Sequence, residues 1–277
     1  GCKYVCRHCP VTPVYQGRFF VVPHDIVLGD IRAQVQAGAR HITFGDPDFL
    51  NGPAHAQRVV RALHAEFPEL TFDFTARIPH LLRYSGLLPE MAAVGCAFVV
   101  SAIESLSDDV LAALVKGHTR ADILRALDLV QKAGMPLRPS LLPFTPWTTL
   151  DDYLELLAFI REKDLVDNID PVQYSLRLLI PPGSALLQKH APAPWLGELD
   201  APGFSYGWTH QDGRMDRLQQ KVAARVERAE RHGEPARSTF AAVEELAFAF
   251  GGLAPPMPRN VPQRRPIPAG LTESWFC

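Results

Sequence analysis

Residues 95–105 have the sequence Gly-Cys-Ala-Phe-Val-Val-Ser-Ala-Ile-Glu-Ser, and this stretch decides the fold class. The run Ala97–Val100 is apolar at four consecutive positions, so both faces of an extended strand would be apolar there. Strands of this kind belong to parallel sheets, because both faces of such a sheet are covered. We therefore expect a parallel strand over Ala97–Ala102, with helices outside it and core inside.

Similar short apolar runs recur along the first two-thirds of the chain, roughly every 25 to 40 residues, the length that a βαβ crossover requires. Longer segments with a helical period lie between them. This order predicts an α/β fold whose parallel sheet is closed or nearly closed. The other expected strands are His41–Phe44, Thr71–Ala76, Leu137–Leu142 and Val172–Leu178.

Two helices between these strands are clear from their apolar stripes. One begins after Thr148 or Thr149, either of which can cap it, and has Asp151 and Asp152 in its first turn, where the helix dipole favours acidic residues. The other ends near Gly134, the expected C-terminal cap. The residues expected to face the core are Leu150, Tyr153, Leu154, Leu157 and Ile160 in the first, and Ile123, Leu124, Leu127 and Val130 in the second.

The pattern changes after Pro181, where prolines become frequent. Residues 191–208 are rich in Pro, Gly and Trp, which predicts irregular structure. We place a boundary near residue 190, with a core over 1–190 and a helical, Pro-rich extension over 191–277. The extension is expected to hold a charged helix with Leu218, Val222 and Val226 on one face, a helix over Ser238–Phe250, and an extended tail over Ala254–Gly270.

The composition is that of an ordinary globular protein, since 47% of the 277 residues are hydrophobic and 21% are charged. The formal net charge of −2 gives no overall basic field that would favour nucleic acid. No run reaches the roughly 18 to 20 apolar residues of a membrane span, and no secretory leader precedes Cys2. We therefore expect a soluble, cytoplasmic protein without a membrane partner.

Three of the five cysteines, Cys2, Cys6 and Cys9, lie within eight residues of one another. An odd, clustered set does not suit a disulfide framework. Thiolates at this density are soft metal ligands, either for an iron–sulfur cluster or for zinc if a fourth ligand such as His8 joined. Cys96 begins a strand and therefore lies at the opposite end of the sheet from the βα loops, so we expect it to be a buried small hydrophobic residue.

The C-x3-C-x2-C spacing of Cys2, Cys6 and Cys9 resembles the signature of the radical S-adenosylmethionine (SAM) superfamily. The resemblance covers residues 1 to about 185. It implies a partial (β/α)6 TIM-like barrel in which three cysteines bind a 4Fe–4S cluster and leave one iron open for SAM. It further implies reductive cleavage of SAM to a 5′-deoxyadenosyl radical that abstracts hydrogen from a substrate, with the electron supplied by a low-potential donor such as flavodoxin or ferredoxin.

The same resemblance assigns contacts with SAM to residues at strand ends. Family members usually have an aromatic side chain near the adenine at the position of His8. Gly45 and Asp46 stand where the family has a Gly-Gly-Glu-Pro-like turn that meets the SAM amino group, although the second glycine and the glutamate are absent. Glu104 and Ser105 match a Gly-x-Glu-Ser stretch, which implies that they face the SAM ribose and carboxylate.

Three arginines lie at or near strand ends: Arg77, Arg138 and Arg177. A guanidinium there can form a bidentate pair of hydrogen bonds with a carboxylate of SAM or substrate. We include Arg138 in the expected cofactor site. Each arginine could instead form a structural salt bridge.

Structural alternatives also exist for the other site residues. Gly-Asp-Pro-Asp at residues 45–48 could be a plain turn. Ser105 or Ser107 could cap the helix that begins near Asp108, and this role does not exclude a contact with SAM.

Both ends of the chain carry further expectations. The family has a strand directly before the cysteine loop, whereas this sequence begins at Gly1, so we expect that strand to be missing. Residues 177–184 and the terminal Glu273–Cys277 resemble radical SAM proteins with a Cys-Cys-Ala-Glu-Pro or Cys-selenocysteine-Ala-Glu-Pro tail. On this hypothesis the codon after Cys277 encodes selenocysteine, and the alternative is a chance terminal cysteine.

The expected function is that of a radical SAM enzyme acting on an unidentified peptide or small metabolite. One alternative is a zinc-stabilised barrel that serves as a binding scaffold. Another is an electron-transfer iron–sulfur protein that has no affinity for SAM. The sequence shows no cobalamin domain, and it does not indicate the substrate.

Overall fold

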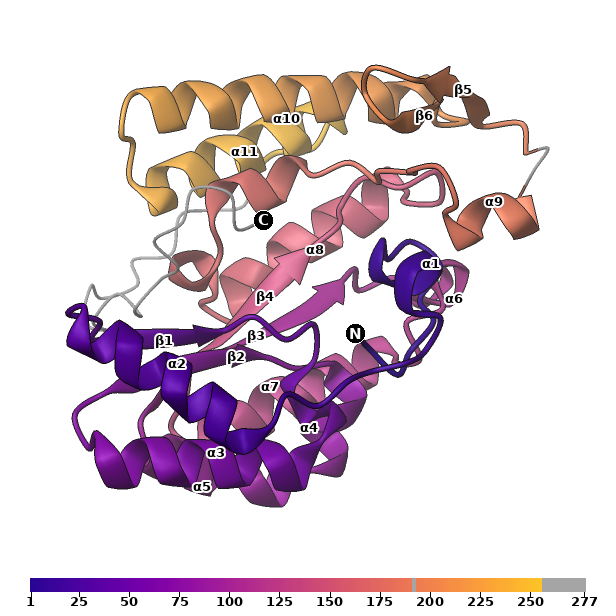
Figure 1. Cartoon of the computed structure of the whole chain (residues 1–277). Helices are drawn as coiled ribbons and strands as arrows, with labels where there is room; N and C mark the ends of the chain where they lie inside the picture. Colours follow the sequence, from indigo (N-terminus) through magenta and orange to yellow (C-terminus); the bar gives the residue numbers. More distant parts are fainter. Residues whose placement is uncertain (191–192, 256–277) are drawn as a thin grey trace.

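The computed structural model describes residues 1–190 and 193–255 (Figure 1). Parallel strands form one sheet in the order β1-β2-β3-β4. The α/β class and the partial-barrel form are thereby confirmed. The expected closed or nearly closed sheet is not found among the described residues, where the sheet is an open arc that ends at β1 and β4. Its strands are β1 (His41–Phe44), β2 (Thr71–Thr75), β3 (Cys96–Glu104) and β4 (Leu137–Leu141).

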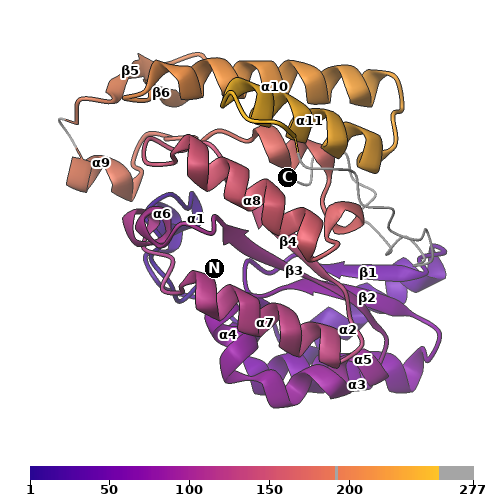
Figure 2. The ribbon, with the colours of Figure 1, turned by 180° about the vertical axis from the view of Figure 1, so that it is seen from behind.

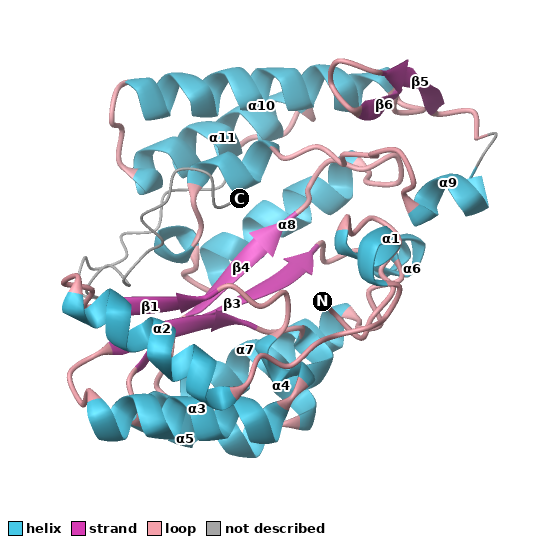
Figure 3. Cartoon of the chain, in the orientation of Figure 1, coloured by secondary structure: helices cyan, strands magenta, loops and turns pink. Residues whose placement is uncertain are grey.

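Helices cover one face of this arc, as Figure 3 shows for α2, α3, α4, α5 and α7. The two helices expected from their apolar stripes are α7 and α8. Thr149 caps α8 by accepting a hydrogen bond from the Asp152 N–H, and Gly134 follows α7 with φ +85°. The helices of the core are α1 (Val11–Tyr15), α2 (His24–Gln36), α3 (Pro53–Glu66), α4 (Ile78–Arg83), α5 (Leu88–Ala93), α6 (Asp108–Leu114), α7 (Arg120–Lys132) and α8 (Leu150–Glu162).

Side chains along β2 point alternately to an apolar and to a polar face of the sheet. Phe72 and Phe74 are fully buried in the main core. Asp73 points to the opposite face, as the period of two in a strand requires. Its Oδ2 lies 2.8 Å from Nε2 of His41 and accepts a hydrogen bond from Oγ1 of Thr43 at 2.7 Å. The buried carboxylate therefore ties β1 to β2.

The expected strand over Val172–Leu178 is wrong. Residues Pro171–Ser175 form a 3-10 helix, η4, and Arg177 makes an isolated parallel bridge with Phe144. Pro171 favours this helical start because it has no N–H to donate and its φ is fixed. A side chain takes the place of a fifth strand, since the Leu141 N–H donates to Oε1 of Gln173 at 3.0 Å.

The C-terminal extension packs on the same core as the sheet. Figure 2 shows α10 and α11 side by side beyond α8. Leu218, Val222 and Val226 are buried in the main core cluster, as their spacing predicted. The stretch expected to be irregular instead contains an antiparallel hairpin. The core ends with α9 (Ala185–His190), and the extension contains β5 (Leu196–Asp200), β6 (Ser205–Trp208), α10 (Gly213–Arg231) and α11 (Ala236–Phe250).

Arg177 holds the hairpin to α10. Its guanidinium lies 3.5 Å from the Trp208 ring centroid and donates to Asp216 at 2.7 Å. This arginine therefore has the structural salt bridge that was the alternative to a ligand contact.

Two expectations fall on parts of the chain that are not described. Nearly all of the expected tail, from residue 256 onward, lies outside the described residues, as does Glu273–Cys277. Within residues 1–190 and 193–255, each helix is too short or too polar to span a lipid bilayer.

Replacing Gln173 with Leu removes the acceptor for the buried Leu141 N–H. We expect the free energy of unfolding, measured by urea denaturation, to fall by about 1–3 kcal/mol, the cost of an unpaired buried donor. Gln131 is exposed on α7, so the control Gln131→Leu should change it by less than about 0.5 kcal/mol. Equal stability of Gln173→Leu and the original chain would contradict this account of the β4 edge.

Candidate functional site

The cysteine loop lies at the carboxyl ends of the strands, where the N-terminus sits beside the tips of β2 and β3 in Figure 1. The Arg7 N–H donates to the carbonyl of Leu114, at the end of α6, at 3.1 Å. Nζ of Lys3 donates to the carbonyl of Asn51, in the loop after β1, at 2.6 Å. The loop is thus fastened to two βα connections.

Cys2, Cys6 and Cys9 are free thiols, with Cys6 buried and the other two partly exposed. Burial raises the pKa of the Cys6 thiol, while the positive charges of Arg77 and Lys116 act to lower it. Among the described residues, no group of three or more His, Cys, Asp or Glu side chains is spaced to hold a metal ion.

Cys96 begins β3 and is buried. Its Sγ donates to the carbonyl of Phe98 at 3.3 Å, and burial raises the pKa of the thiol far above its usual range. Glu104, at the other end of the same strand, contacts the cysteine loop. Cys96 is therefore the small buried residue expected from the sequence, distant from the loop.

Glu104 ends β3 in a left-handed conformation, with φ +62°, just after an irregularity in the strand pairing. Its buried Oε1 accepts a hydrogen bond from Nζ of Lys116 at 2.9 Å and lies 3.2 Å from Nε2 of His8. Burial alone would raise the pKa of Glu104, but Lys116 and His8 together hold it well below its usual range. The carboxylate is thus ionised and joins the strand end to the cysteine loop.

Ser105 is buried next to Glu104, and its Oγ accepts a hydrogen bond from the Ser107 N–H at 3.1 Å. Ser107 is the residue before α6 but makes no capping bond with its own side chain. Ser105 therefore shapes the turn into α6 but does not cap the helix, so neither serine makes the capping bond that was the structural alternative. Ser105 stays beside Glu104.

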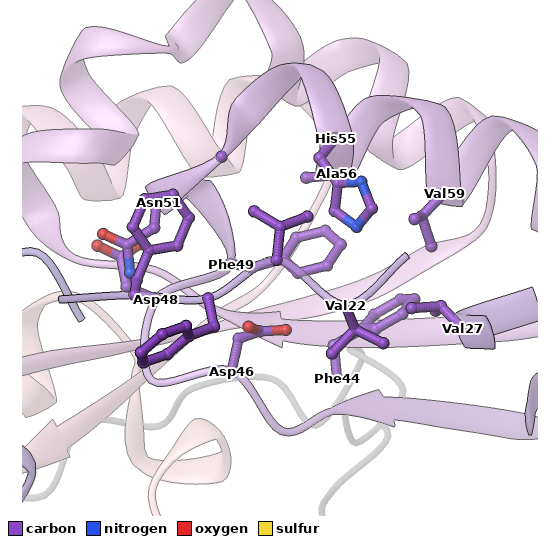
Figure 4. Close-up of a pocket in the computed structure, with 14 residues that line it drawn as sticks. Val22, Val27, Phe44, Asp46, Asp48, Phe49, Asn51, His55, Ala56 and Val59 are labelled. Atoms are coloured by element: carbon purple, nitrogen blue, oxygen red, sulfur yellow. The ribbon is translucent and has the colours of Figure 1, made fainter. Parts of the chain in front are cut away.

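Gly45 and Asp46 follow β1 at the same end of the sheet. A Cβ at Gly45 would meet no atom within 4 Å, so its backbone is open to a ligand. Asp46 points toward an apolar cavity of about 100 Å³ whose lining includes Phe44, Phe49 and His55 (Figure 4). Desolvation raises the pKa of Asp46, although the N-terminal amino group and His55 oppose this effect.

The structure does not bring Arg138 to this group, and we correct its assignment. Strand pairing places Arg138 beside Val100, four residues before Glu104 in β3. Its guanidinium donates to both carboxylate oxygens of Asp170, at 3.0 and 3.2 Å. Arg138 therefore forms a structural salt bridge, which was the alternative to a contact with SAM or substrate.

The sequence did not reveal how the cysteine loop is held. Tyr4, between Cys2 and Cys6, has its hydroxyl 3.0 Å from Nε2 of His80. Nδ1 of His80 is 2.7 Å from Oδ2 of the buried Asp48. These partners are far apart in sequence. The available signal was that Asp48 follows β1 and that His80 lies in α4, which follows β2.

Replacing Glu104 with Gln leaves the buried Lys116 ammonium without a counter-charge. We expect the free energy of unfolding to fall by about 3–5 kcal/mol in chemical denaturation. Glu155 pairs with Arg120 at the surface, so Glu155→Gln should cost less than about 1 kcal/mol. Similar small losses in both variants would show that the Glu104 pair is not effectively buried.

His118 predicts a pH dependence of stability. Burial, Lys116 and Arg77 lower the pKa of His118 to about 4. Between roughly pH 6.5 and 4 the unfolded chain binds a proton that the folded chain does not, so stability should fall as the pH falls across that window, by up to about 3 kcal/mol from this group. Urea denaturation against pH tests this, and His118→Gln should flatten the slope; an unchanged slope would contradict the assignment.

The family model described as Radical SAM superfamily matches residues 1–160. A ribosomal protein uS12 methylthiotransferase RimO of Parabacteroides distasonis is 24% identical over 176 residues, covering 58% of this chain and 39% of the relative. A tRNA-2-methylthio-N(6)-dimethylallyladenosine synthase of Desulfosudis oleivorans is 30% identical over 199 residues, covering 65% and 40%. The chain thus spans about two fifths of the length of these curated relatives.

Solved structures agree with this fold. The cobalamin-dependent S-adenosylmethionine radical enzyme OxsB, with aqua-cobalamin and S-adenosylmethionine bound, gives a TM-score of 0.66 at 18% identity, covering 83% of this chain and 40% of that one. The radical S-adenosylmethionine methyltransferase TsrM of Kitasatospora setae, with cobalamin and a [4Fe-4S] cluster bound, gives 0.62 at 15% identity, covering 91% and 59%. Since the family model matches more than half of the sequence, the chain belongs to the radical SAM superfamily.

Proposed function

We propose that this chain is the core of a radical SAM enzyme. The observation that carries the proposal is the placement of three free thiols, Cys2, Cys6 and Cys9, at the carboxyl ends of a parallel sheet and beside the ionised Glu104. Active sites of barrels built from βα units form at that end of the strands. We assign residues 1–190 to the core and 191–277 to an extension, of which the described residues 193–255 pack on the core.

The donor set fits a 4Fe–4S cluster. Three thiolates on one short loop are soft ligands that suit iron–sulfur chemistry, and three protein ligands leave a position for a reacting molecule. When bound, the cluster would supply the electron that cleaves SAM reductively to a 5′-deoxyadenosyl radical, which abstracts hydrogen from the substrate. The chain's own residues then have the tasks of binding and orienting SAM.

Glu104 is suited to bind the SAM ribose. Its contacts with Lys116 and His8 both use Oε1, so Oε2 can accept a hydrogen bond from a ribose hydroxyl. Lys116 fixes the carboxylate in place and keeps it ionised. His8 stands on the cysteine loop beside the same carboxylate, where we propose that it contacts the adenine.

Gly45, Asp46 and Ser105 complete the proposed SAM site. The open backbone at Gly45 and the carboxylate of Asp46 offer acceptors to the SAM ammonium group. Ser105, one residue after Glu104, offers a hydroxyl to the SAM carboxylate. We leave Arg138 out of this site, because its charge is already neutralised by the ion pair with Asp170.

We propose a peptide or small metabolite as the substrate and a low-potential donor such as flavodoxin or ferredoxin as the electron source. The cytoplasm suits a site of three reduced thiols. The relatives' names refer to a ribosomal protein and a tRNA, and the chain spans only part of each, so neither substrate is assigned to it. Membership of the Cys-Cys-Ala-Glu-Pro-tail group stays a sequence-based prediction.

The enzyme assay is made on chain reconstituted anaerobically with iron and sulfide and reduced with dithionite in the presence of SAM. We expect 5′-deoxyadenosine and methionine, measured by liquid chromatography and mass spectrometry. Cys6→Ala should bring both to background because it removes a cluster ligand, whereas Cys96→Ala should retain them, since Cys96 is buried at the far end of β3.

Two results would favour the other hypotheses. A colourless protein that binds zinc in stoichiometric amount would indicate the scaffold. A brown protein whose cluster spectrum does not change with SAM would indicate electron transfer.

A further inference from the structure

The Arg77 guanidinium is buried without a matching negative charge. The residue is only 7% exposed, and within the described part of the chain no carboxylate lies within 4.0 Å of it. Nη2 donates to the carbonyl of Lys116, but Nε and Nη1 are buried without a hydrogen-bond partner. A buried charge in this state destabilises the folded protein unless a counter-charge is supplied.

Arg138, the other arginine that is buried among the described residues, does not share this condition. It has a carboxylate partner in Asp170, and the partly buried Arg161 and Arg177 are paired with Glu244 and Asp216. Lys116, a second buried cation near the cysteine loop, is neutralised by Glu104 at 2.9 Å. Arg7, in the loop itself, is only partly buried and also has an unpaired Nη1. Arg77 is therefore the buried arginine of the described chain that has no carboxylate partner.

The position of Arg77 indicates where its counter-charge belongs. Its guanidinium carbon lies 3.5 Å from the ring centroid of Tyr4, which stands between Cys2 and Cys6 in the loop. Asp48, the buried acid beside His80, lies more than 4.0 Å from Arg77, and its Oδ2 is 2.7 Å from Nδ1 of His80.

We propose that Arg77 is the counter-cation of the iron–sulfur cluster and raises its midpoint potential. The inference rests on the proposed function. Three thiolates make the bound cluster anionic, and one-electron reduction adds a further negative charge, so a nearby cation stabilises the reduced form more than the oxidised form. The same anionic group offers acceptors for Nε and Nη1 of Arg77, the two nitrogens that have no hydrogen-bond partner in the protein.

A purely structural role is the competing explanation, because Arg77 also stacks on Tyr4 and holds the Lys116 carbonyl. Two substitutions distinguish the effect of the charge from the effect of the guanidinium's shape. Arg77→Lys keeps the charge but loses the stacking on Tyr4 and the planar set of N–H donors. Arg77→Gln keeps an N–H donor and loses the charge. Arg138→Gln is the matched control, since it removes a buried arginine that is already paired.

The test is an EPR-monitored redox titration of each anaerobically reconstituted protein with dithionite, without SAM or substrate. We expect Arg77→Gln to make reduction at least about tenfold less favourable, which corresponds to a midpoint potential lower by about 59 mV for one electron. Arg77→Lys should stay within about threefold of the original protein, and Arg138→Gln should not change. Circular dichroism of each apo protein establishes that it is folded.

Each other result has a defined meaning. A folded Arg77→Gln that loads no iron while Arg77→Lys loads normally supports the proposal, because it shows that the charge holds the cluster. An unchanged potential in Arg77→Gln overturns it, and so does an equal drop in both variants, which identifies a structural brace. If Arg77→Gln does not fold, the potential of Arg77→Lys alone decides. If the unmutated chain forms no 4Fe–4S cluster, the proposed function itself fails.

Discussion

The buried ion pair between Glu104 and Lys116 is the constraint on which the site depends. Glu104 ends β3 with a positive φ, a conformation that costs a non-glycine residue free energy and persists only where surrounding contacts enforce it. Lys116 and His8 supply those contacts, and they come from the α6–α7 connection and the cysteine loop. One carboxylate oxygen thus joins three segments that the sequence keeps apart, and the other remains for a ligand.

The cysteine loop has little regular structure of its own, so its position comes from side chains of the surrounding βα loops. Lys3 reaches the loop after β1, and Tyr4 contacts both His80 and Arg77. Each anchor lies at the carboxyl end of a strand, which is where a parallel sheet collects its loops. The loops at the end of the sheet therefore fix the position of the three thiols. The charge of Arg77, which has no carboxylate partner, favours an anionic group at the same place.

The strands β1 to β4 and the helices α7, α8, α10 and α11 could be predicted because the spacing of apolar residues records which face of an element is buried. Motif spacing placed His8 and Glu104 in one site with the cysteines, and the two side chains do meet in the structure. Their contacts with a cluster and SAM stay a prediction. The segment 172–178 could not, because its apolar residues are buried by a 3-10 helix and Gln173 takes the place of strand pairing. Contacts such as Tyr4 with His80 and Arg138 with Asp170 depend on tertiary packing, which no local pattern encodes.

On our proposal the cysteine loop holds a cluster with an iron open to SAM. This can be tested by EPR spectroscopy of the anaerobically reconstituted and reduced chain, recorded with and without SAM. We expect a 4Fe–4S signal whose shape changes when SAM is added, and a loss of that change in Glu104→Ala with the cluster retained. A signal that SAM leaves unchanged, or a chain that binds zinc and gives no signal, would contradict it.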